Sequence, residues 1–529
     1  MKQEVFTKKK EIVEFFLKKG ILLSNDILLK LEDIDEEKLN ILSKKITSPD
    51  LLILNDDIVN LLNDIYNTQD INWLDLEQSR AFSEKGKESS YGRFLEAISK
   101  TSVEIKTDER YPVRVVFTYR NEIKKWTPED FIEHFNVRFR SLEKLLRKRQ
   151  ELTSLTSINK LMSKREKENV SLIGMVQKKE FTKNNNLILT IEDNTGNIKI
   201  IVNKNKPQLF EETQKIVLDE VIGIIGVVSN GVVFANNVIW PEIPANRELK
   251  KCSDECYAIF LSDLHIGSRY FMEEEFVRFI KWLNLEIGDE HQRGIAEKVG
   301  YIFLVGDIID GCGVYPGQED DLLIKDVKMQ YSECARFLRS IPSHIRIIMC
   351  AGNHDAMRLT EPQMPLYREY AEELYKLPNL VSVSNPSLVN IHARGNFQGF
   401  DVLLYHGYSF DYYVANVDYI RNNGGYDRVD LIMKFLLQRR HLAPTHSSNS
   451  YIPDTKLDSL VIESIPDIFV TGHIHKAMLT NFRGITMICA SCWQSLTEYQ
   501  KRHGHKPDPC RVPIVNLKTR EARIMRFGK

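Results

Sequence analysis

The spacing of apolar residues changes character several times along the chain. In residues 1–75 they recur at helical spacing, as with Ile12 and Phe16, and Gly20 is placed to end the first helix. We therefore expect a small helical N-terminal module. A plain packing unit and a protein-binding module would both produce this pattern.

Residues 76–165 are expected to form a linker and a helical segment. The stretch SRAFSEKGKESSYGR is polar and contains Gly and Ser, as linkers do. A helix is then predicted from Pro128, because Thr127 is a suitable N-cap and Asp130 occupies the capping-box position.

Residues 166–245 switch to short β-type runs separated by turn residues. The runs are VSLIGMV, LILTIED, IKIIVN, EVIGIIGVV and GVVFANNVIW. Five strands at this spacing predict an OB-type β-barrel. Some barrels of this type bind single-stranded nucleic acid and others join protein domains, and the periodicity favours neither role.

Residues 250–529 follow an α/β pattern in which apolar, strand-like runs end in chemically active side chains. Asp263 and His265 follow YAIFL, Asp307 follows YIFLV, Asn353, His354 and Asp355 follow IRIIMCA, His406 follows DVLLY, and His473 and His475 follow DIFV. Each motif alone is common in turns and helix caps. Five of them at strand ends predict one shared site, because strand ends at one edge of a sheet converge on a crevice.

The residue types indicate a metal site. The candidate ligands are carboxylate, amide and imidazole groups without a thiolate, which suits Mn²⁺, Fe²⁺ or a mixed pair better than structural zinc. Seven ligands are too many for one ion, whereas two ions roughly 3.5–4 Å apart and bridged by a carboxylate would use them all. Such a pair can polarise a phosphoryl group and produce a nucleophile from water.

Composition limits which classes of binding partner and cellular compartment are expected. Lys plus Arg is 72 and Asp plus Glu is 73, for a net charge of -1, which argues against a nucleic-acid binder driven by bulk positive charge. The eight cysteines are too sparse for a disulfide scaffold and fit a reducing compartment. With neither a signal-peptide pattern nor a bilayer-length apolar run, we expect a cytoplasmic protein without a membrane partner.

The motif order D-x-H, G-D, G-N-H-D, H, G-H-x-H resembles that of the calcineurin-like metallophosphoesterases. The resemblance implies a β-sandwich flanked by helices. It also implies roles for the site residues: Asp263, His265 and His475 on one ion, Asn353, His406 and His473 on the other, Asp307 as bridge, His354 as general acid or phosphate stabiliser, and Asp355 as the residue that holds His354.

The order of helical module, linker, barrel and phosphoesterase is similar to that of the small subunits of archaeal DNA polymerase D. The stretches RRHLAPTH, PDIFVTGHIHKA and WQSLTEYQKR also resemble that family, with His446 in APTHSS as a local departure. The resemblance implies a proofreading 3′→5′ exonuclease that acts on a DNA 3′ end and is bound to a large catalytic subunit. Its two divalent ions are expected to be Mn²⁺, with Fe²⁺, Mg²⁺ and Zn²⁺ as alternatives.

Two other functions stay open at this point. The chain could be a catalytically silent scaffold subunit with a vestigial metal site, or a phosphomonoesterase. The metal ligands alone do not exclude the second, although the preceding barrel argues against it. No DNA-binding residues can be assigned from the sequence.

Overall fold

The computed structural model describes residues 110–120, 124–164, 166–502 and 504–528, together with two short strands nearer the N-terminus. The chain divides into two compact units, Met1–Thr101 and Ser102–Lys529. In the first unit, β1 (Leu22–Leu23) pairs in parallel with β2 (Ile53–Leu54), which the helical pattern did not predict. The rest of the predicted helical module and the polar linker lie outside the described residues.

Two six-stranded sheets form the larger part of the second unit. The first has the order β12 (Leu380–Ser382), β11 (Arg346–Cys350), β10 (Val299–Val305), β9 (Tyr257–Leu261), β18 (Arg511–Asn516) and β19 (Ala522–Arg526). The second has the order β16 (Ala477–Phe482), β17 (Ile485–Ala490), β15 (Ile468–Thr471), β14 (Phe400–Leu404), β13 (Ser387–Ile391) and β3 (Val113–Thr118). The central strands β9, β10 and β11 are parallel, as are β14 and β15.

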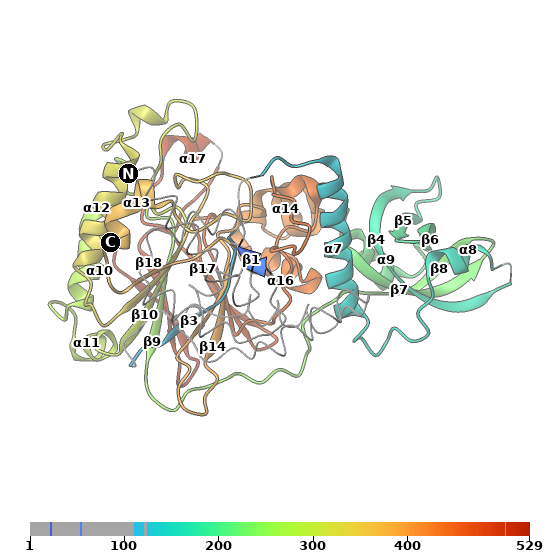
Figure 1. Ribbon diagram of the computed structural model, residues 1–529, viewed down its shortest axis with the longest axis horizontal. Helices are drawn as coiled ribbons and strands as arrows, with labels where there is room; N and C mark the ends of the chain where they lie inside the picture. The colour runs from blue at the N-terminus through green and yellow to red at the C-terminus, as the bar shows by residue number, and fades with distance from the viewer. Residues whose placement is uncertain are drawn as a thin grey trace. The chain divides into compact units, whose positions relative to one another are not determined.

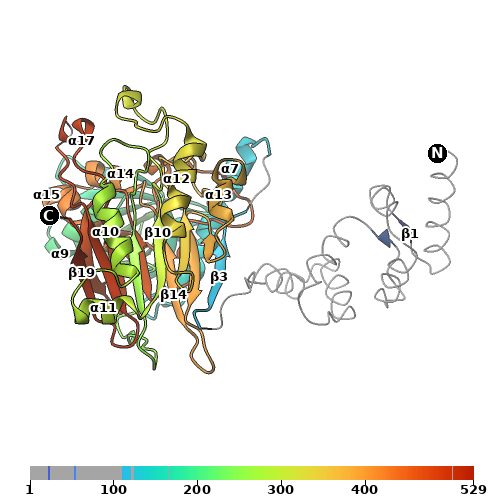
Figure 2. The same ribbon diagram turned by 90° about the vertical axis from the view of Figure 1, so that its left-hand side faces the viewer.

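The two sheets pack face to face, with helices on both outer faces (Figure 1). One face is covered by α10 (Glu273–Leu283), α11 (Glu290–Ala296), α12 (Val327–Arg339) and α13 (Arg368–Tyr375), seen in front of the strands in Figure 2. The other carries α14 (Phe410–Asn416), α15 (Asp418–Asn422) and α16 (Val429–Arg439). Strand β10 is buried at every position, as expected for a strand covered on both sides. This confirms the predicted helix-flanked sandwich.

Shorter helices lie in the connections: η3 (Gln318–Asp320), η4 (Gly425–Asp427), η5 (His446–Ser448) and α17 (Glu498–Arg502).

The second sheet contains a strand that the sequence pattern did not predict. Strand β3 pairs antiparallel with β13 at the edge of the sheet, although residues 76–165 were expected to hold only linker and helix. Val113 and Val115 point into the core between the sheets. The phosphoesterase fold is thus completed by residues that precede the barrel in the chain.

The predicted OB-type barrel is confirmed. It is closed in the order β4 (Glu168–Phe181), β5 (Leu187–Asp193), β6 (Gly196–Val202), β8 (Val232–Ile239) and β7 (Val221–Ser229), with α8 (Ile158–Met162) and α9 (Pro207–Gln214) packed on it. Each of the five predicted runs forms one strand.

Helix α7 (Pro128–Leu146) lies between the barrel and the helices α14 and α16 (Figure 1). It starts as predicted, and Asp130 Oδ2 accepts from the Thr127 backbone N–H at 2.9 Å. On its other side, the buried Arg138 donates from Nε to Asp458 Oδ2 at 2.7 Å. His441 donates from Nε2 to the same oxygen at 3.0 Å, and its Nδ1 accepts from the Ala443 backbone N–H at 2.9 Å.

A second buried ion pair fixes the barrel to the phosphoesterase domain. Arg439 Nε, at the end of α16, lies 2.5 Å from Glu220 Oε2, next to β7, and both side chains are about 1% exposed. Arg439 also donates to the Lys215 carbonyl at 2.8 Å, and Glu220 accepts from the Val217 backbone N–H at 3.0 Å. A buried ion pair of this kind tolerates few alternative positions and so defines one docked arrangement of the two domains.

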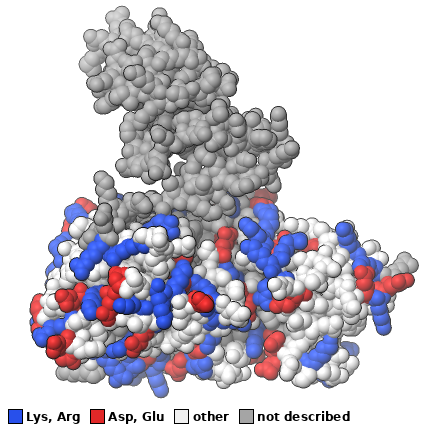
Figure 3. Space-filling model, turned by 90° about the horizontal axis from the view of Figure 1, so that it is seen from below, with Lys and Arg blue, Asp and Glu red and all other residues white. Residues whose placement is uncertain are grey.

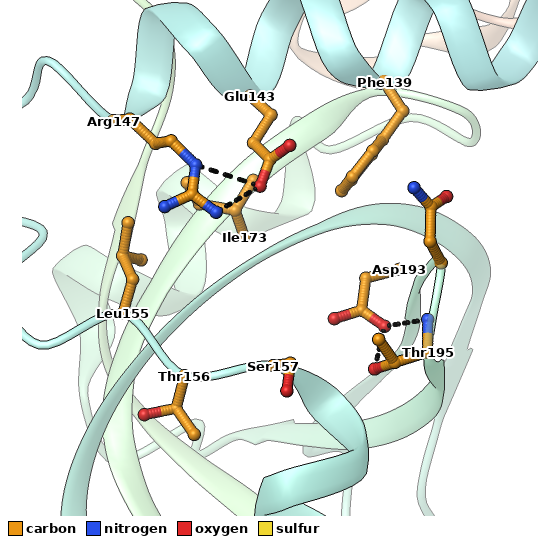
Figure 4. A pocket seen from close by; sticks show the side chains of 10 residues that line it. Phe139, Glu143, Arg147, Leu155, Thr156, Ser157, Ile173, Asp193 and Thr195 are labelled. Carbon is orange, nitrogen blue, oxygen red and sulfur yellow. Dashed lines mark hydrogen bonds and ion pairs between the residues drawn. The ribbon is translucent and has the colours of Figure 1, made fainter. Parts of the chain in front are cut away.

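A cavity of about 220 Å³ lies at the seam between α7 and the barrel (Figure 4). Its polar groups are largely paired with one another: Arg147 with Glu143, and Thr195 with Asp193. Asp193 also accepts from the Ile158 backbone N–H at the start of α8. These contacts give the cavity a structural role.

Surface charge is mixed over the described residues. Figure 3 shows basic and acidic side chains interspersed on one face, in keeping with the net charge of -1. Among the described helices, none has the length and apolar content needed to cross a bilayer.

Candidate metal centre

The predicted site residues come together at the carboxyl ends of five strands. Asp263 and His265 follow β9, Asp307 follows β10, Asn353, His354 and Asp355 follow β11, His406 follows β14, and His473 and His475 follow β15. Most of these side chains are buried, whereas Asn353, His354 and His473 are half-buried. The latter three therefore mark the open side of the site.

Three of the donors form a first group. His475 Nε2 lies 3.2 Å from Asp263 Oδ1 and 3.1 Å from His265 Nε2. His265 Nε2 is 3.9 Å from Asp263 Oδ1. A carboxylate oxygen and two imidazole nitrogens thus converge on one point, as ligands of a common cation do.

A second group lies on the other side of Asp307. His406 Nε2 is 3.0 Å from Asn353 Oδ1 and 3.3 Å from Asp307 Oδ2. The ring of His473 lies edge-on to that of His406, 5.3 Å between centroids, and its ligand atom is within 4.8 Å of those of His406 and Asp307. Asp307 Oδ2 is also 3.9 Å from His265 Nε2, so this one carboxylate faces both groups.

The backbone at the site has an unusual conformation. Asp263, His265, Asp307, His473 and His475 all have left-handed φ angles, between 48° and 67°. Residues other than glycine adopt this region at a cost of about 1–3 kcal/mol each and cluster at functional sites when they do. The strand ends are turned sharply so that their side chains point into the crevice.

Glycine is required where backbone passes close to these ligands. A Cβ at Gly472 would lie 1.8 Å from Ser262 Oγ and 2.5 Å from Asp263 Oδ2. A Cβ at Gly352 would lie 2.3 Å from Asp307 Oδ1. This explains the glycine that precedes the polar residues in GNHD and GHIH.

Acceptors behind the histidines fix which ring nitrogen faces the site. His265 Nδ1–H donates to Asp310 Oδ1 at 2.9 Å, and His406 Nδ1–H donates to the Val305 carbonyl at 2.9 Å. In both rings Nε2 is left with its lone pair toward the centre. His475 differs, because the Gln500 amide nitrogen Nε2 lies 3.0 Å from its Nδ1 and places a donor there. For His475 Nε2 to bind a metal, Nδ1 must carry the proton, so the Gln500 amide must turn to present its oxygen.

His473 is oriented in the opposite sense. Its Nε2–H donates to Asp411 Oδ2 at 3.0 Å, which leaves Nδ1 for the centre. Neither Asp310 nor Asp411 was predicted as a site residue. Asp310 stands three residues after Asp307 in GDIID, but a contact to His265 is formed only in the folded chain. Asp411 lies in α14, outside any strand end.

The family resemblance had implied that Asp355 holds His354, but the two side chains have different partners. His354 Nδ1–H donates to the Asp310 carbonyl at 2.8 Å, so this backbone oxygen holds the ring. The Asp355 carboxylate instead accepts from the Gly352 N–H at 2.8 Å and from the Tyr331 hydroxyl at 3.0 Å. Asp355 therefore holds the GNHD turn, not the imidazole.

The electrostatics of the site match a cation-binding role. Burial alone would raise the pKa of Asp263, but the His475 imidazole brings it below its ordinary value. Burial would likewise raise the pKa of Asp307, which His406 lowers well below the usual range. Burial lowers the pKa of His406, but the negative charge of Asp307 raises it by more, so the pKa of His406 is about 10. The buried carboxylates thus hold a positive partner, and the donor set fits a divalent cation in that place.

Comparison with known proteins agrees with this geometry. Residues 258–477 match the calcineurin-like phosphoesterase family, and residues 170–238 match the OB-fold nucleic acid binding domain family. Divalent metal ions are implied by the first match, and the Asp and His groups described above are candidates to hold them.

Similarity extends over most of the chain to the DNA polymerase II small subunits of several archaea. Identity is 41% over 387 residues to that of Methanothermobacter thermautotrophicus, covering 73% of this chain and 77% of the relative. The identity to the small subunit of Pyrococcus furiosus is 37% over 393 residues, which cover 74% of this chain and 62% of the relative. The identity to the small subunit of Pyrococcus abyssi is 34% over 462 residues, which cover 84% of this chain and 73% of the relative. The chain belongs to the family of DNA polymerase II small subunits, the small subunits of archaeal family D DNA polymerases.

Proposed function

We propose that this chain is a 3′→5′ exodeoxyribonuclease that removes nucleotides from a DNA 3′ end within a D-family polymerase holoenzyme. One observation carries the proposal: six donors from the strand ends converge on either side of Asp307, the seventh, with His354 at the open side. The large catalytic subunit is the expected partner and supplies the polymerising site. We also propose domain boundaries at residues 75, 165 and 245, with β3 as a strand that the phosphoesterase domain takes from the segment before the barrel.

Two divalent cations are proposed in this centre, with Mn²⁺ as the expected pair and Fe²⁺, Mg²⁺ or Zn²⁺ as alternatives. Asp263, His265 and His475 would hold one, Asn353, His406 and His473 would hold the other, and Asp307 would contact both. When bound, the pair withdraws charge from the phosphoryl group and supplies a nucleophile at neutral pH.

The residues of the chain then position the reaction. The bond that breaks joins phosphorus to the 3′ oxygen of the penultimate nucleotide, and the terminal nucleotide leaves as its 5′-monophosphate. The departing oxygen needs a proton or a hydrogen bond. His354 is placed to provide it as an imidazolium: Nδ1–H is committed to the Asp310 carbonyl, and the Nε2–H that the ring carries when protonated is directed to the substrate.

A strand-polarity assay tests the proposal. Full-length protein with Mn²⁺, alone and with the large subunit, is given 3′-tailed and 5′-tailed labelled duplexes. We expect a ladder from the 3′ tail only, and none with Asp307→Ala, which removes the carboxylate that faces both metal-binding groups. Intact strands under all conditions would refute nuclease activity, and faster turnover of a chromogenic phosphomonoester than of DNA would favour a phosphomonoesterase.

An architectural role in the holoenzyme is a second candidate. The buried Glu220–Arg439 and Arg138–Asp458 pairs, which join barrel, α7 and phosphoesterase domain, favour a rigid body suited to assembly. The net charge of -1 also indicates that much of the affinity for DNA would come from a partner. If mismatch removal by the holoenzyme were unchanged by Asp307→Ala, the chain would be a scaffold only.

A further inference from the structure

A pocket of about 680 Å³ opens beside the metal centre. Its volume falls within the range of about 300–1,000 Å³ that is typical of ligand sites. Six of its lining residues carry the argument: Phe131 from α7, Tyr408, Asp411 and Tyr412 after β14, and His446 and Tyr451 from the loop that includes η5.

The pocket and the metal centre share a wall. The ring of Tyr408 lies edge-on to that of His473, 5.7 Å between centroids. Asp411 accepts from His473 Nε2 at 3.0 Å. A substrate phosphate at the centre would therefore place its neighbouring nucleoside at the mouth of this pocket.

The aromatic rings of the lining are held in place by their neighbours. Tyr451 stacks on His134, 5.1 Å between centroids and 19° between planes, and its hydroxyl lies 2.7 Å from His446 Nδ1. Phe131 stands edge-on to Tyr451 at 5.9 Å and is 37% exposed. Tyr412 is half-buried and its hydroxyl accepts from Ser447 Oγ at 3.2 Å. A rigid lining loses little entropy when a ligand binds.

The charge of the lining decides between ligand classes. Among the described residues that line the pocket there is neither lysine nor arginine, and its carboxylate, Asp411, is already paired with His473. Phosphate groups are therefore poorly suited to it, whereas flat neutral rings are well suited. Aromatic side chains stack on every type of nucleobase, because each base has a π-face.

The loop of the pocket is tied to both the barrel and the metal centre. The His446 backbone N–H donates to Asp219 Oδ2, before β7, at 2.8 Å. Asn449 donates to Glu361, whose carboxylate also accepts from the Tyr405 hydroxyl at 3.0 Å, next to His406. The pocket thus keeps a fixed distance from the metal-binding groups.

We propose that this pocket binds the unpaired bases at a DNA 3′ end by stacking. The proposal rests on the exonuclease function proposed above and deepens it. A paired base remains stacked in its duplex, whereas a mismatched end frays more easily, so a stacking pocket beside the centre favours mismatched ends.

The test combines two substrates with three variants of the full-length protein. The substrates are single-stranded oligonucleotides whose 3′-terminal nucleotide carries a base or is abasic. With Tyr412→Ala we expect kcat/KM to fall about tenfold for the first, in the range known for loss of a stacked base, and to stay unchanged for the second. Tyr412→Phe keeps the ring and should cleave like the wild type. Tyr370→Ala, an exposed tyrosine on α13, is the matched control.

A binding measurement separates the two proposals. An oligonucleotide with 2-aminopurine at its 3′ end and a phosphorothioate linkage is titrated with the wild type in Mn²⁺. We expect the wild type to quench the fluorescence of the 2-aminopurine, and the Tyr412→Ala variant to quench it less. Quenching without cleavage of the unprotected strand would support the pocket and sink the exonuclease. Cleavage without quenching, equal losses on both substrates, or neither cleavage nor quenching would each overturn the pocket proposal.

Discussion

Replacing Asp310 by Asn tests whether the residues behind the ligands set the metal affinity. Its Oδ1 accepts from His265 Nδ1 at 2.9 Å and from Gln494 Nε2 at 3.0 Å. Its Oδ2 accepts from Gln318 Nε2 at 3.0 Å. The side chain is 1% exposed, so water cannot replace a lost contact.

The amide of Asn is isosteric but carries two donors. If its oxygen keeps His265 and Gln494, its NH₂ group faces the NH₂ group of Gln318. Gln318 cannot turn without losing the Val314 N–H, which its Oε1 accepts at 2.8 Å. One buried donor is left unsatisfied, at a cost of about 1–3 kcal/mol, and the bond to His265 loses its charge assistance.

We expect the affinity for Mn²⁺ to fall about 10- to 100-fold, the usual effect of removing a partner of a ligating histidine. This corresponds to about 1.4–2.7 kcal/mol. Isothermal titration calorimetry measures the affinity directly, and urea unfolding measures the stability without metal. Asp320→Asn makes the same change of charge on an exposed neighbour and serves as control. Wild-type affinity in a folded Asp310→Asn protein would refute the reasoning.

Three other predictions follow from the described contacts. His354→Ala should leave Mn²⁺ affinity intact by calorimetry while cleavage falls about 10²–10⁴-fold, and an equal loss of metal would contradict its assignment as a donor to substrate. Arg439→Met leaves Glu220 buried without its partner, so the free energy of unfolding measured in urea should fall by about 3–5 kcal/mol. Adding Glu220→Leu should restore most of this stability, and no recovery would show that the loss does not come from the ion pair. Burial, and next the Arg138 charge, lower the pKa of His441 to about 4, whereas an unfolded histidine has a pKa near 6.5. The contribution of His441 to the free energy of unfolding should therefore be full above about pH 6.5. It should fall by up to about 1.4 kcal/mol per pH unit as the pH decreases toward 4. Replacing His441 by Asn should flatten that part of the pH profile, and an unchanged slope would exclude it as the titrating group.

The parts of the fold that were predictable are those with a local signal. Turn residues separate the five barrel runs, and Thr127 with Asp130 marks the start of α7. The site was predictable because each ligand follows its own apolar run, and parallel strands bring such ends together. One such motif alone is common in turns and helix caps, and it was the recurrence at five strand ends that indicated a shared site.

The parts that were missed depend on long-range contacts. Strand β3 is six residues long and lies far from β13 in the sequence, so neither its length nor its neighbours revealed its sheet. Asp310 and Asp411 act on His265 and His473 from other elements, a relation that spacing does not encode. The partner of His354 is a backbone carbonyl, which every residue has.

The left-handed backbone at five ligand positions also bears on how such a site could be lost. Glycine would relieve the conformational strain at each of these positions, so abandoning the chemistry would make the protein easier to fold. The phosphoesterase scaffold does not need these side chains for its two sheets, whose core is formed by other residues. A descendant freed from the need for metal could therefore keep the architecture and relieve backbone strain at each of these five positions.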